Sequence, residues 1–398
     1  MYPSNSPGGW RLLGRTSAAL WDPDRNPPAL LAPGMRVRFR RVEALAGTAA
    51  PPGPRSAPPT PPAPPATPAS GQPSDFHDRG SWSPNSGRDL PRSWKSRPAI
   101  EVIKPGPLAT VQDLGRPGYG HLGVPRSGAA DVASLRLANR LVGNPDGAAG
   151  IELTLGRAAL RFPAGARVAV TGAPVPLTVE PAAEEAARDM PHGSAIEVPA
   201  GSVLRVGAPT AGVRSYLAVR GGVGVPPVLG SRSADLRSGL GPAALRPGDV
   251  LPVGDERTAA TQPTATPATM MPVTVMPVAG EPAVLHVVPG PRDDWFAPDA
   301  LRELCAGTYV VTPASDRTGL RLDGPALPFA GRGELLSEGV VTGALQVPHG
   351  GRPILLLADH PVTGGYPVIA TLVSADIGLA AQLRPGSKLR FTLAARGR

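Results

Sequence analysis

The sequence has little cysteine, few aromatic residues and no long apolar run, and each shortage excludes a class of protein. A single cysteine, Cys305, excludes a disulfide framework within the chain and favours a reducing compartment, so we expect the cytoplasm. The sequence has no run of about 18 apolar residues, the length that a membrane span requires. The N-terminus also lacks the pattern of a secretory signal. Aromatic residues make up only 4% of the chain, which suits short strands and turns better than a helical bundle.

Familiar catalytic and metal-binding motifs are absent as well. The sequence contains neither the G-x-x-x-x-G-K-[ST] phosphate loop nor the G-x-S-x-G nucleophile turn. The six histidines show no ligand spacing: His77, His121, His192, His286, His349 and His360. We therefore expect no metal site.

A net charge of +9 could indicate nucleic-acid binding, but the positive charge is not spread evenly along the chain. Residues 1–97 carry 13 Arg and Lys against 6 Asp and Glu, whereas the remaining residues carry 27 against 25. The main body is therefore close to neutral, and no nucleic-acid groove is expected there.

Proline and glycine, by contrast, are abundant and divide the chain. Ten of the twenty residues in 51–70 are proline, a composition that favours extended polyproline conformations and cannot bury a core. We expect 47–97 to be a disordered spacer, and the Pro/Thr/Ala-rich segment 255–282 to be a second linker. Between and after them, short apolar runs separated by Gly and Pro indicate a barrel or sandwich of strands.

A few helices are expected among these strands. Residues 131–144 (DVASLRLANRLVGN) have apolar residues at helical spacing, with Asp131 or an earlier residue as a cap and Gly143 as a stop. Further short helices are expected near 297–305 and 376–383.

An internal repeat supports two related β units in tandem. Residues 245–253 (LRPGDVLPV) match residues 383–391 (LRPGSKLRF), and each copy follows a Pro-x6-Ser-Ala-Asp segment, at 226–235 and 367–376. A Pro-Gly turn leading into a closing strand accounts for the pattern. The signature returns a third time at 31–39 (LAPGMRVRF), so the head resembles the end of another such unit.

Long collinear motifs give the chain a family resemblance. Residues 100–144 (IEVIKPGPLATVQDLGRPGYGHLGVPRSGAADVASLRLANRLVGN), 289–296 (PGPRDDWF), 315–325 (SDRTGLRLDGP) and 337–391 resemble the KipA-type family. This family is also called the C subunit of 5-oxoprolinase, or allophanate hydrolase subunit 2-like, and includes the biotin-dependent carboxyltransferase domain of urea carboxylase. The head, residues 2–39, is similar to the C-terminal end of KipI, the B subunit of 5-oxoprolinase.

The resemblance implies a mainly β fold with a few short helices, built as two tandem cyclophilin-like β-barrel units. The expected organisation is a KipI-like remnant at 1–46, the linker at 47–97, a first unit at 98–254, the linker at 255–282 and a second unit at 283–398. Most of the KipI-like part is missing, so either Met1 lies inside a longer fused protein, which we expect, or the upstream gene has been truncated.

The resemblance also implies one component of an enzyme complex. The chain would correspond to the C subunit of ATP-dependent 5-oxoprolinase, a hydrolase that converts 5-oxo-L-proline, ATP and water to L-glutamate. Its partners would be a KipI-like B subunit together with a LamB/YcsF-like A subunit. ATP would be used by the complex, and the chain alone would be inactive. The alternatives are a urea-carboxylase-like carboxyltransferase component, with biotin on another chain, and a non-enzymatic regulatory module that antagonises KipI.

Polar residues inside these motifs are the candidate site. Glu338 is a general base or a turn carboxylate, and Asp359 and His360 follow an apolar strand, at a loop position where function is often placed. Asp113 and Arg116 could form a local pair that holds a loop, or Arg116 could bind carboxylate or phosphate oxygens.

The remaining candidates are assigned to binding of substrate or anions. They are His121, Asp316, Arg317, Gln346, Thr363, Gly364, Gly365 and Tyr366. His121 could equally be a surface histidine, and the segment 363–365 either forms a backbone nest for an anion or an ordinary hairpin turn.

Overall fold

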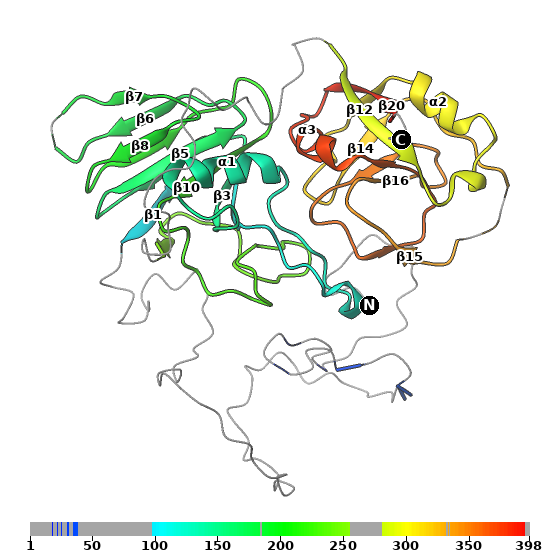
Figure 1. Ribbon diagram of the computed structural model, residues 1–398, viewed down its shortest axis with the longest axis horizontal. Helices are drawn as coiled ribbons and strands as arrows, with labels where there is room; N and C mark the ends of the chain where they lie inside the picture. Colours follow the sequence, from blue (N-terminus) through cyan, green and yellow to red (C-terminus); the bar gives the residue numbers. More distant parts are fainter. Residues whose placement is uncertain are drawn as a thin grey trace, which may run out of the picture. The chain divides into compact units, whose positions relative to one another are not determined.

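The computed structural model describes residues 98–254 except 184, residues 281–394 except 332 and 334, and isolated positions between 18 and 38. The spacer expected at 47–97, nearly all of the linker expected at 255–282 and most of the 1–46 head lie outside the described residues. Residues 98–394 fall within one compact unit of the chain (Figure 1).

Two antiparallel sheets form the first half of this unit. One has the strand order β11-β1-β4-β9-β6-β7, with β1 at Ala99–Lys104, β4 at Ala158–Arg161, β6 at Leu177–Glu180, β7 at Arg188–Met190, β9 at Val203–Val206 and β11 at Val250–Pro252. The other has the order β2-β3-β10-β5-β8, with β2 at Leu108–Gln112, β3 at Gly150–Thr154, β5 at Ala166–Gly172, β8 at Ala195–Val198 and β10 at Arg214–Val219.

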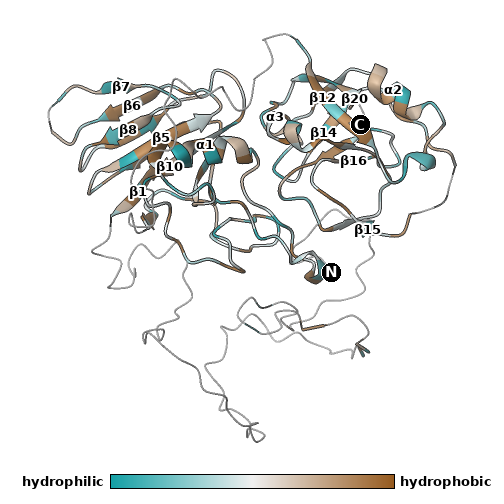
Figure 2. Ribbon diagram, viewed as in Figure 1, coloured by the Kyte–Doolittle hydropathy of each residue, from teal (hydrophilic) through white to brown (hydrophobic). Residues whose placement is uncertain are grey.

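Strand β10 is buried along its whole length because it is central in its sheet. It pairs with β3 on one edge and β5 on the other, and helix α1 (Val132–Val142) packs against both β5 and β10. A strand covered in this way has an almost continuous apolar sequence, as in SYLAV. Figure 2 shows apolar residues along the strands, and both apolar and polar residues on α1.

Helix α1 confirms the expected boundaries. The Asp131 side chain accepts a hydrogen bond from the Ser134 backbone N–H at 3.1 Å, which satisfies one of the free donors of the first turn. Gly143 ends the helix in the left-handed conformation, with φ of 79°. The other two expected helices are α2 at Ala300–Ala306 and α3 at Ile377–Ala381.

The second half is a closed barrel with the strand order β12-β19-β16-β17-β14-β13-β20. Its strands are β12 at Ala283–Pro289, β13 at Tyr309–Val311, β14 at Gly319–Asp323, β16 at Ala344–Gln346, β17 at Ile354–Leu356, β19 at Val368–Leu372 and β20 at Lys388–Leu393. A separate pair, β15 at Glu338–Gly339 and β18 at Thr363–Gly364, stands beside it. Buried Leu285, Tyr309, Leu345, Ile369 and Phe391 are part of the barrel core.

The expected mainly β fold with few short helices is confirmed, and the two halves differ in how the sheet ends. Strand β20 pairs with both β12 and β13, which closes the ring of the second half. Strand β11, its counterpart in the repeat, pairs with β1 alone and forms the edge of its sheet. The strands of the first half therefore remain in two sheets.

The repeated Leu-Arg-Pro-Gly segments fold into the same turn in both halves. Gly248 and Gly386 have φ of 89° and 87°, and the next residue donates its N–H back to the arginine carbonyl at 3.2 and 2.9 Å. This is a type II turn, which favours proline second and glycine third. The third copy, at 31–39, lies largely outside the described residues.

No helix in the described part of the chain combines the length and the apolar character that a membrane crossing requires.

Buried and exposed side chains alternate along strand β12, and this alternation predicts how substitutions there affect stability. Leu285 is fully buried, whereas its neighbour Val284 is 47% exposed on the outer face of the barrel. Replacing Leu285 with Ala should lower the free energy of unfolding by about 2–5 kcal/mol through lost burial and a cavity, and Val284→Ala should change it by about 0.5 kcal/mol or less. Urea denaturation measures both, and equal effects of the two variants would contradict the alternation.

Candidate functional site

Four charged side chains are buried together where segments of the two halves meet. Glu152 lies in β3 and Arg214 begins β10, whereas Arg317 precedes β14 and Asp359 follows β17. Their side chains are at most 5% exposed. Charges buried to this degree must be compensated by partners.

Arg317 compensates both carboxylates at once. Its Nε and Nη2 donate to Asp359 at 2.8 and 3.1 Å, its Nη1 donates to Glu152, and Nη2 also donates to the Gly128 carbonyl at 2.6 Å. Burial alone lowers the pKa of Arg317, but the two carboxylates outweigh it, and the pKa is raised. The guanidinium is therefore a fixed positive charge between the halves.

Glu152 is satisfied from several directions. Besides Arg317, it accepts the Ala130 N–H at 3.0 Å and the Tyr216 hydroxyl at 2.9 Å, and Arg214 lies 3.5 Å away. Burial raises the pKa of the Glu152 carboxyl, but Arg317 and Arg214 together hold it below its ordinary value of 4.5. Burial, with Glu152 and Asp131 nearby, raises the pKa of Tyr216 well above 10, so the hydroxyl remains a donor.

Asp359, predicted to be catalytic, has both carboxylate oxygens bound to neighbouring side chains. One carboxylate oxygen accepts the Ser127 hydroxyl at 2.7 Å, and both oxygens accept Arg317. The side chain is only 2% exposed. Asp359 and the predicted anion-binding Arg317 thus bind each other within the second half, and their bonds to Ser127 and Glu152 connect it to the first half.

A glutamine adds a second, neutral connection between the halves. Gln382, just after α3, accepts the N–H groups of Val213 and Arg214 at 3.0 and 2.8 Å and donates to Asp131 at 3.0 Å. Gln382, Glu152 and Arg214 were not predicted from the sequence. Their only sequence signal is a polar residue within an otherwise apolar segment.

Asp113 and Arg116 lie together but do not pair. Asp113 accepts from the Ser231 and Ser233 hydroxyls at 2.7 and 2.5 Å and from the Arg232 N–H at 2.6 Å. Arg116 instead donates to the Ser233 carbonyl and, at 3.4 Å, to the Val228 carbonyl.

Arg116 is only 1% exposed, and its Nη1 has no hydrogen-bond partner in the described part of the chain. Burial lowers its pKa, although Asp235, Asp113 and Asp359 oppose the shift. Arg116 is therefore the one predicted anion-binding residue with a buried, unused donor among the described residues.

The loop that carries His121 reaches the second half. A Cβ added at Gly120 would lie 3.8 Å from the side chain of Val362, next to His360 and Pro361. His121 itself is exposed, and its Nδ1 lies 3.1 Å from the Gly118 carbonyl. This geometry is that of a surface residue held by its own turn.

His360 is enclosed rather than open to substrate. It is 7% exposed, and its ring nitrogens lie 2.7 Å from the Pro361 carbonyl and 3.1 Å from the Thr342 hydroxyl. Burial lowers the pKa of His360. The hydrogen bond to the Pro361 carbonyl and the charge of Asp359 raise it by less, so the imidazole is neutral at neutral pH.

The strand pair β15–β18 brings several predicted residues together. Glu338 pairs with Gly364 and Gly339 with Thr363, while Gln346 donates to the Tyr366 carbonyl at 3.2 Å. A side chain at position 364 would collide with the Gln346 amide. Glycine at 364 thus leaves room for the Gln346 amide, and residues 363–364 form a short strand paired with the distant residues 338–339 rather than a hairpin turn.

Asp316 acts on its own turn. Its carboxylate accepts the N–H groups of Thr318 and Gly319 at 2.7 and 3.3 Å, and no bond joins it to Arg317 among the described residues. Asp316 thus shapes the loop that presents Arg317 to the junction.

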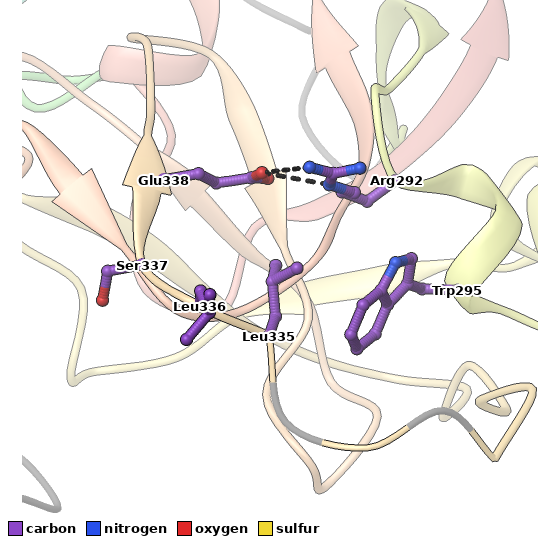
Figure 3. A pocket seen from close by; sticks show the side chains of 6 residues that line it. All are labelled: Arg292, Trp295, Leu335, Leu336, Ser337 and Glu338. Carbon is purple, nitrogen blue, oxygen red and sulfur yellow. Dashed lines mark hydrogen bonds and ion pairs between the residues drawn. The ribbon is translucent and has the colours of Figure 1, made fainter.

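A pocket of about 370 Å³ opens beside Glu338. Its lining residues are Arg292, Trp295, Leu335, Leu336, Ser337 and Glu338. Arg292 Nε and Nη2 both donate to Glu338 Oε2, at 3.0 and 2.8 Å, and Figure 3 shows the two head groups meeting, with Trp295 below them. Arg292 follows the Gly-Pro turn after β12, and Trp295 ends the short 3-10 helix Asp293–Trp295.

The pocket is partly open to solvent, unlike the junction. The side chains of Arg292 and Glu338 are 40% and 23% exposed. The hydrogen bond to Glu338, followed by its negative charge, raises the pKa of Arg292. Glu338 is the one predicted catalytic residue that a small molecule can reach, since Asp359 and His360 are enclosed. No group of His, Cys, Asp and Glu in the described ranges could hold a metal ion.

The junction gives a stability prediction. Replacing Arg317 with Met leaves Glu152 and Asp359 buried without their shared partner, which should lower the free energy of unfolding by about 3–5 kcal/mol. The control is Arg321→Met in β14, where the side chain is exposed, with an expected change of about 0.5 kcal/mol or less. Similar urea midpoints for wild type and Arg317→Met would show that the network does not stabilise the fold.

The lowered pKa of Glu152 predicts acid sensitivity. Its charged form is favoured in the folded state, so its contribution is complete above the ordinary pKa of 4.5 and is lost as the pH falls through the lower folded value. The Glu152→Gln variant should therefore be less stable at about pH 6 and lose less stability than wild type towards about pH 3. Urea unfolding across this range measures the slope, and Glu197→Gln, at a side chain 76% exposed, is the control.

Comparisons with known proteins agree on one kind of relative. The family model "Carboxyltransferase domain, subdomain A and B" matches residues 122–393, and "Carboxyltransferase domain, subdomain C and D" matches residues 1–31. The C subunit of 5-oxoprolinase from Escherichia coli K12 is 35% identical over 295 residues, which cover 73% of this chain and 90% of that protein. The B subunit of 5-oxoprolinase from Escherichia coli O157:H7 is 56% identical over 39 residues, 10% of this chain and 18% of that protein.

Solved structures give the same result. The crystal structure of TTHA0988 aligns with a TM-score of 0.73 and 36% identity, covering 97% of this chain and 67% of that one. The Kluyveromyces lactis urea carboxylase aligns with a TM-score of 0.64 and 31% identity, covering 75% of this chain and 28% of that one. With most of its length matched in both sequence and fold, the chain belongs to the family of the carboxyltransferase domain, subdomains A and B.

Proposed function

We propose that this chain acts as the C subunit of an ATP-dependent 5-oxoprolinase, which converts 5-oxo-L-proline, ATP and water to L-glutamate. The observation that carries the proposal is that one chain contains segments similar to two subunits of the same enzyme. The body is similar to the C subunit of 5-oxoprolinase over 90% of that protein, and the head is similar to the B subunit of the same enzyme. The partners would be a KipI-like B subunit together with a LamB/YcsF-like A subunit.

Opening the lactam ring requires an activated carbonyl group and a residue that transfers protons. Phosphorylating the lactam oxygen with ATP, bound at the level of the complex, would release ADP and activate the lactam carbon towards attack by water. The ring C–N bond would then break, the nitrogen would leave as the protonated amine, and a second water would hydrolyse the acyl phosphate to glutamate and phosphate. We assign the general-base role to Glu338, since its carboxylate lies in an open pocket. The enclosed Asp359 and His360 would position the loops around it.

Anion binding is proposed at two places. Arg116 has an N–H donor without a partner among the described residues; it is as enclosed as Asp359, so an oxyanion or a phosphoryl oxygen would have to enter that buried site to accept from it. The segment 363–365 adjoins the pocket wall, because a Cβ at Gly365 would lie 3.6 Å from the Leu335 carbonyl and from the Ser337 hydroxyl. Its backbone N–H groups, together with Thr363 and Tyr366, would contact substrate from that side.

A urea-carboxylase-like carboxyltransferase component is the second candidate. The observation in its favour is the structural likeness to the urea carboxylase, although this chain covers only 28% of that protein. Biotin would then be carried by another chain. Carboxyl transfer from carboxybiotin to a small amide, without turnover of 5-oxoproline, would favour this candidate.

Reconstitution tests the first candidate. The chain mixed with the A and B subunits of 5-oxoprolinase should consume 5-oxo-L-proline and release glutamate in the presence of ATP, and the chain alone should release none. The matched variant Glu338→Gln should lower kcat by about 100-fold or more, as expected for loss of a general base. A complex that hydrolyses ATP but leaves 5-oxoproline intact would rule this function out.

A further inference from the structure

The pocket beside Glu338 has one donor and one acceptor still available. Arg292 uses Nε and Nη2 on a single oxygen of Glu338, Oε2. Among the described residues, neither Arg292 Nη1 nor Glu338 Oε1 has a hydrogen-bond partner. A cationic donor and an anionic acceptor are thus both left unused on two side chains that line the same pocket.

The charge around this pair selects against a simple anion. Glu338 neutralises Arg292, and Asp294 adds a further negative charge near the same guanidinium. A free carboxylate or phosphate gains one bond from Nη1 and is repelled by both acids. A ligand that also donates an N–H to Glu338 Oε1 turns that repulsion into a second, charge-assisted hydrogen bond.

The remaining wall is apolar and suits a small ring. Trp295 and Leu335 are half-buried and line the pocket, and Leu336, 88% exposed, lies at its rim. At about 370 Å³, the space is at the lower end of the range of small-molecule sites. In the view of Figure 3 the indole lies below the ion pair, and Trp295 lines the same pocket, so it offers an apolar surface for the methylene groups of a ring.

We propose that this pocket is the subsite for a five-membered cyclic imino or lactam acid, which it holds by two adjacent polar groups. The carboxylate accepts from Arg292 Nη1, and the ring N–H donates to Glu338 Oε1. This inference rests on the proposed function, and it deepens it: in 5-oxo-L-proline these two groups are neighbours on the ring. The lactam carbonyl, on the other side of the nitrogen, then lies next to the bound N–H and close to Glu338, which agrees with the general-base role proposed for that residue.

The proposal is tested by equilibrium binding of 5-oxo-L-proline to the complex of this chain with the A and B subunits, without ATP, so that no turnover occurs. Arg292→Gln and Glu338→Ala should each raise Kd by about 10- to 100-fold, as for a lost hydrogen bond to a charged group. The control is Arg302→Gln, which removes another exposed Arg–Asp pair outside the pocket and should change Kd less than about twofold.

Changes to the ligand test the same two contacts. The ligand 2-pyrrolidinone lacks the carboxylate, and N-methyl-5-oxoproline lacks the N–H. Each should bind the wild-type complex about 10- to 100-fold more weakly than 5-oxo-L-proline does. Arg292→Gln should weaken 2-pyrrolidinone little further, and Glu338→Ala should weaken N-methyl-5-oxoproline little further, because the contact is already missing. Urea, added as a ligand, should not compete with 5-oxo-L-proline for the pocket. In a separate measurement, the midpoint of urea denaturation of each variant checks that the variant folds.

The outcomes separate the two proposals. Unchanged Kd in both variants, or no binding by the wild-type complex, overturns the subsite. If 5-oxoproline is turned over normally by Arg292→Gln, the subsite is wrong while the proposed function stands. If lactam acid binds and the variants weaken it while ATP-dependent turnover is absent, the subsite stands and the proposed function is wrong.

Discussion

The arrangement of this unit depends on one buried guanidinium. Arg317 leaves the second half and ends between Glu152 of the first half and Asp359 of its own. An ion pair buried this deeply costs desolvation, so its value lies as much in excluding other arrangements as in adding stability. Each displaced partner would leave an uncompensated charge, and the two halves therefore have one favourable way to meet at this point.

The open pocket is separate from that network. The junction residues have almost no exposed surface, whereas Arg292 and Glu338 are reached from solvent on the edge of the barrel. Polar groups whose bonds are all internal hold structure, and those with unused donors and acceptors are available to a ligand. This division assigns Asp359 and Arg317 to the fold and leaves Glu338 accessible to a ligand.

The sequence predicted local features well and long-range contacts poorly. Helix α1 was predicted because Asp131 and Gly143 sit next to the residues they cap, and the Arg-Pro-Gly turns because proline and glycine impose them locally. Glu152 gave no such signal: within a strand it is one polar residue, and its partner Arg317 lies 165 positions away. Asp359 was recognised as important, but its enclosure depends on Ser127, 232 positions away, which no local pattern can indicate.

Leu336 is exposed and lines the pocket, so a protein partner that covered it would couple its own binding to that of a ligand. A protein surface that covers this leucine removes water from the rim of the pocket as well as from an apolar side chain. With less water nearby, the charges of Arg292 and Glu338 act on a ligand through a lower effective dielectric. Because linkage is reciprocal, a ligand that gains from the covered rim must strengthen attachment of the covering surface by the same factor. Occupancy of the pocket and assembly at its edge would then form a single equilibrium.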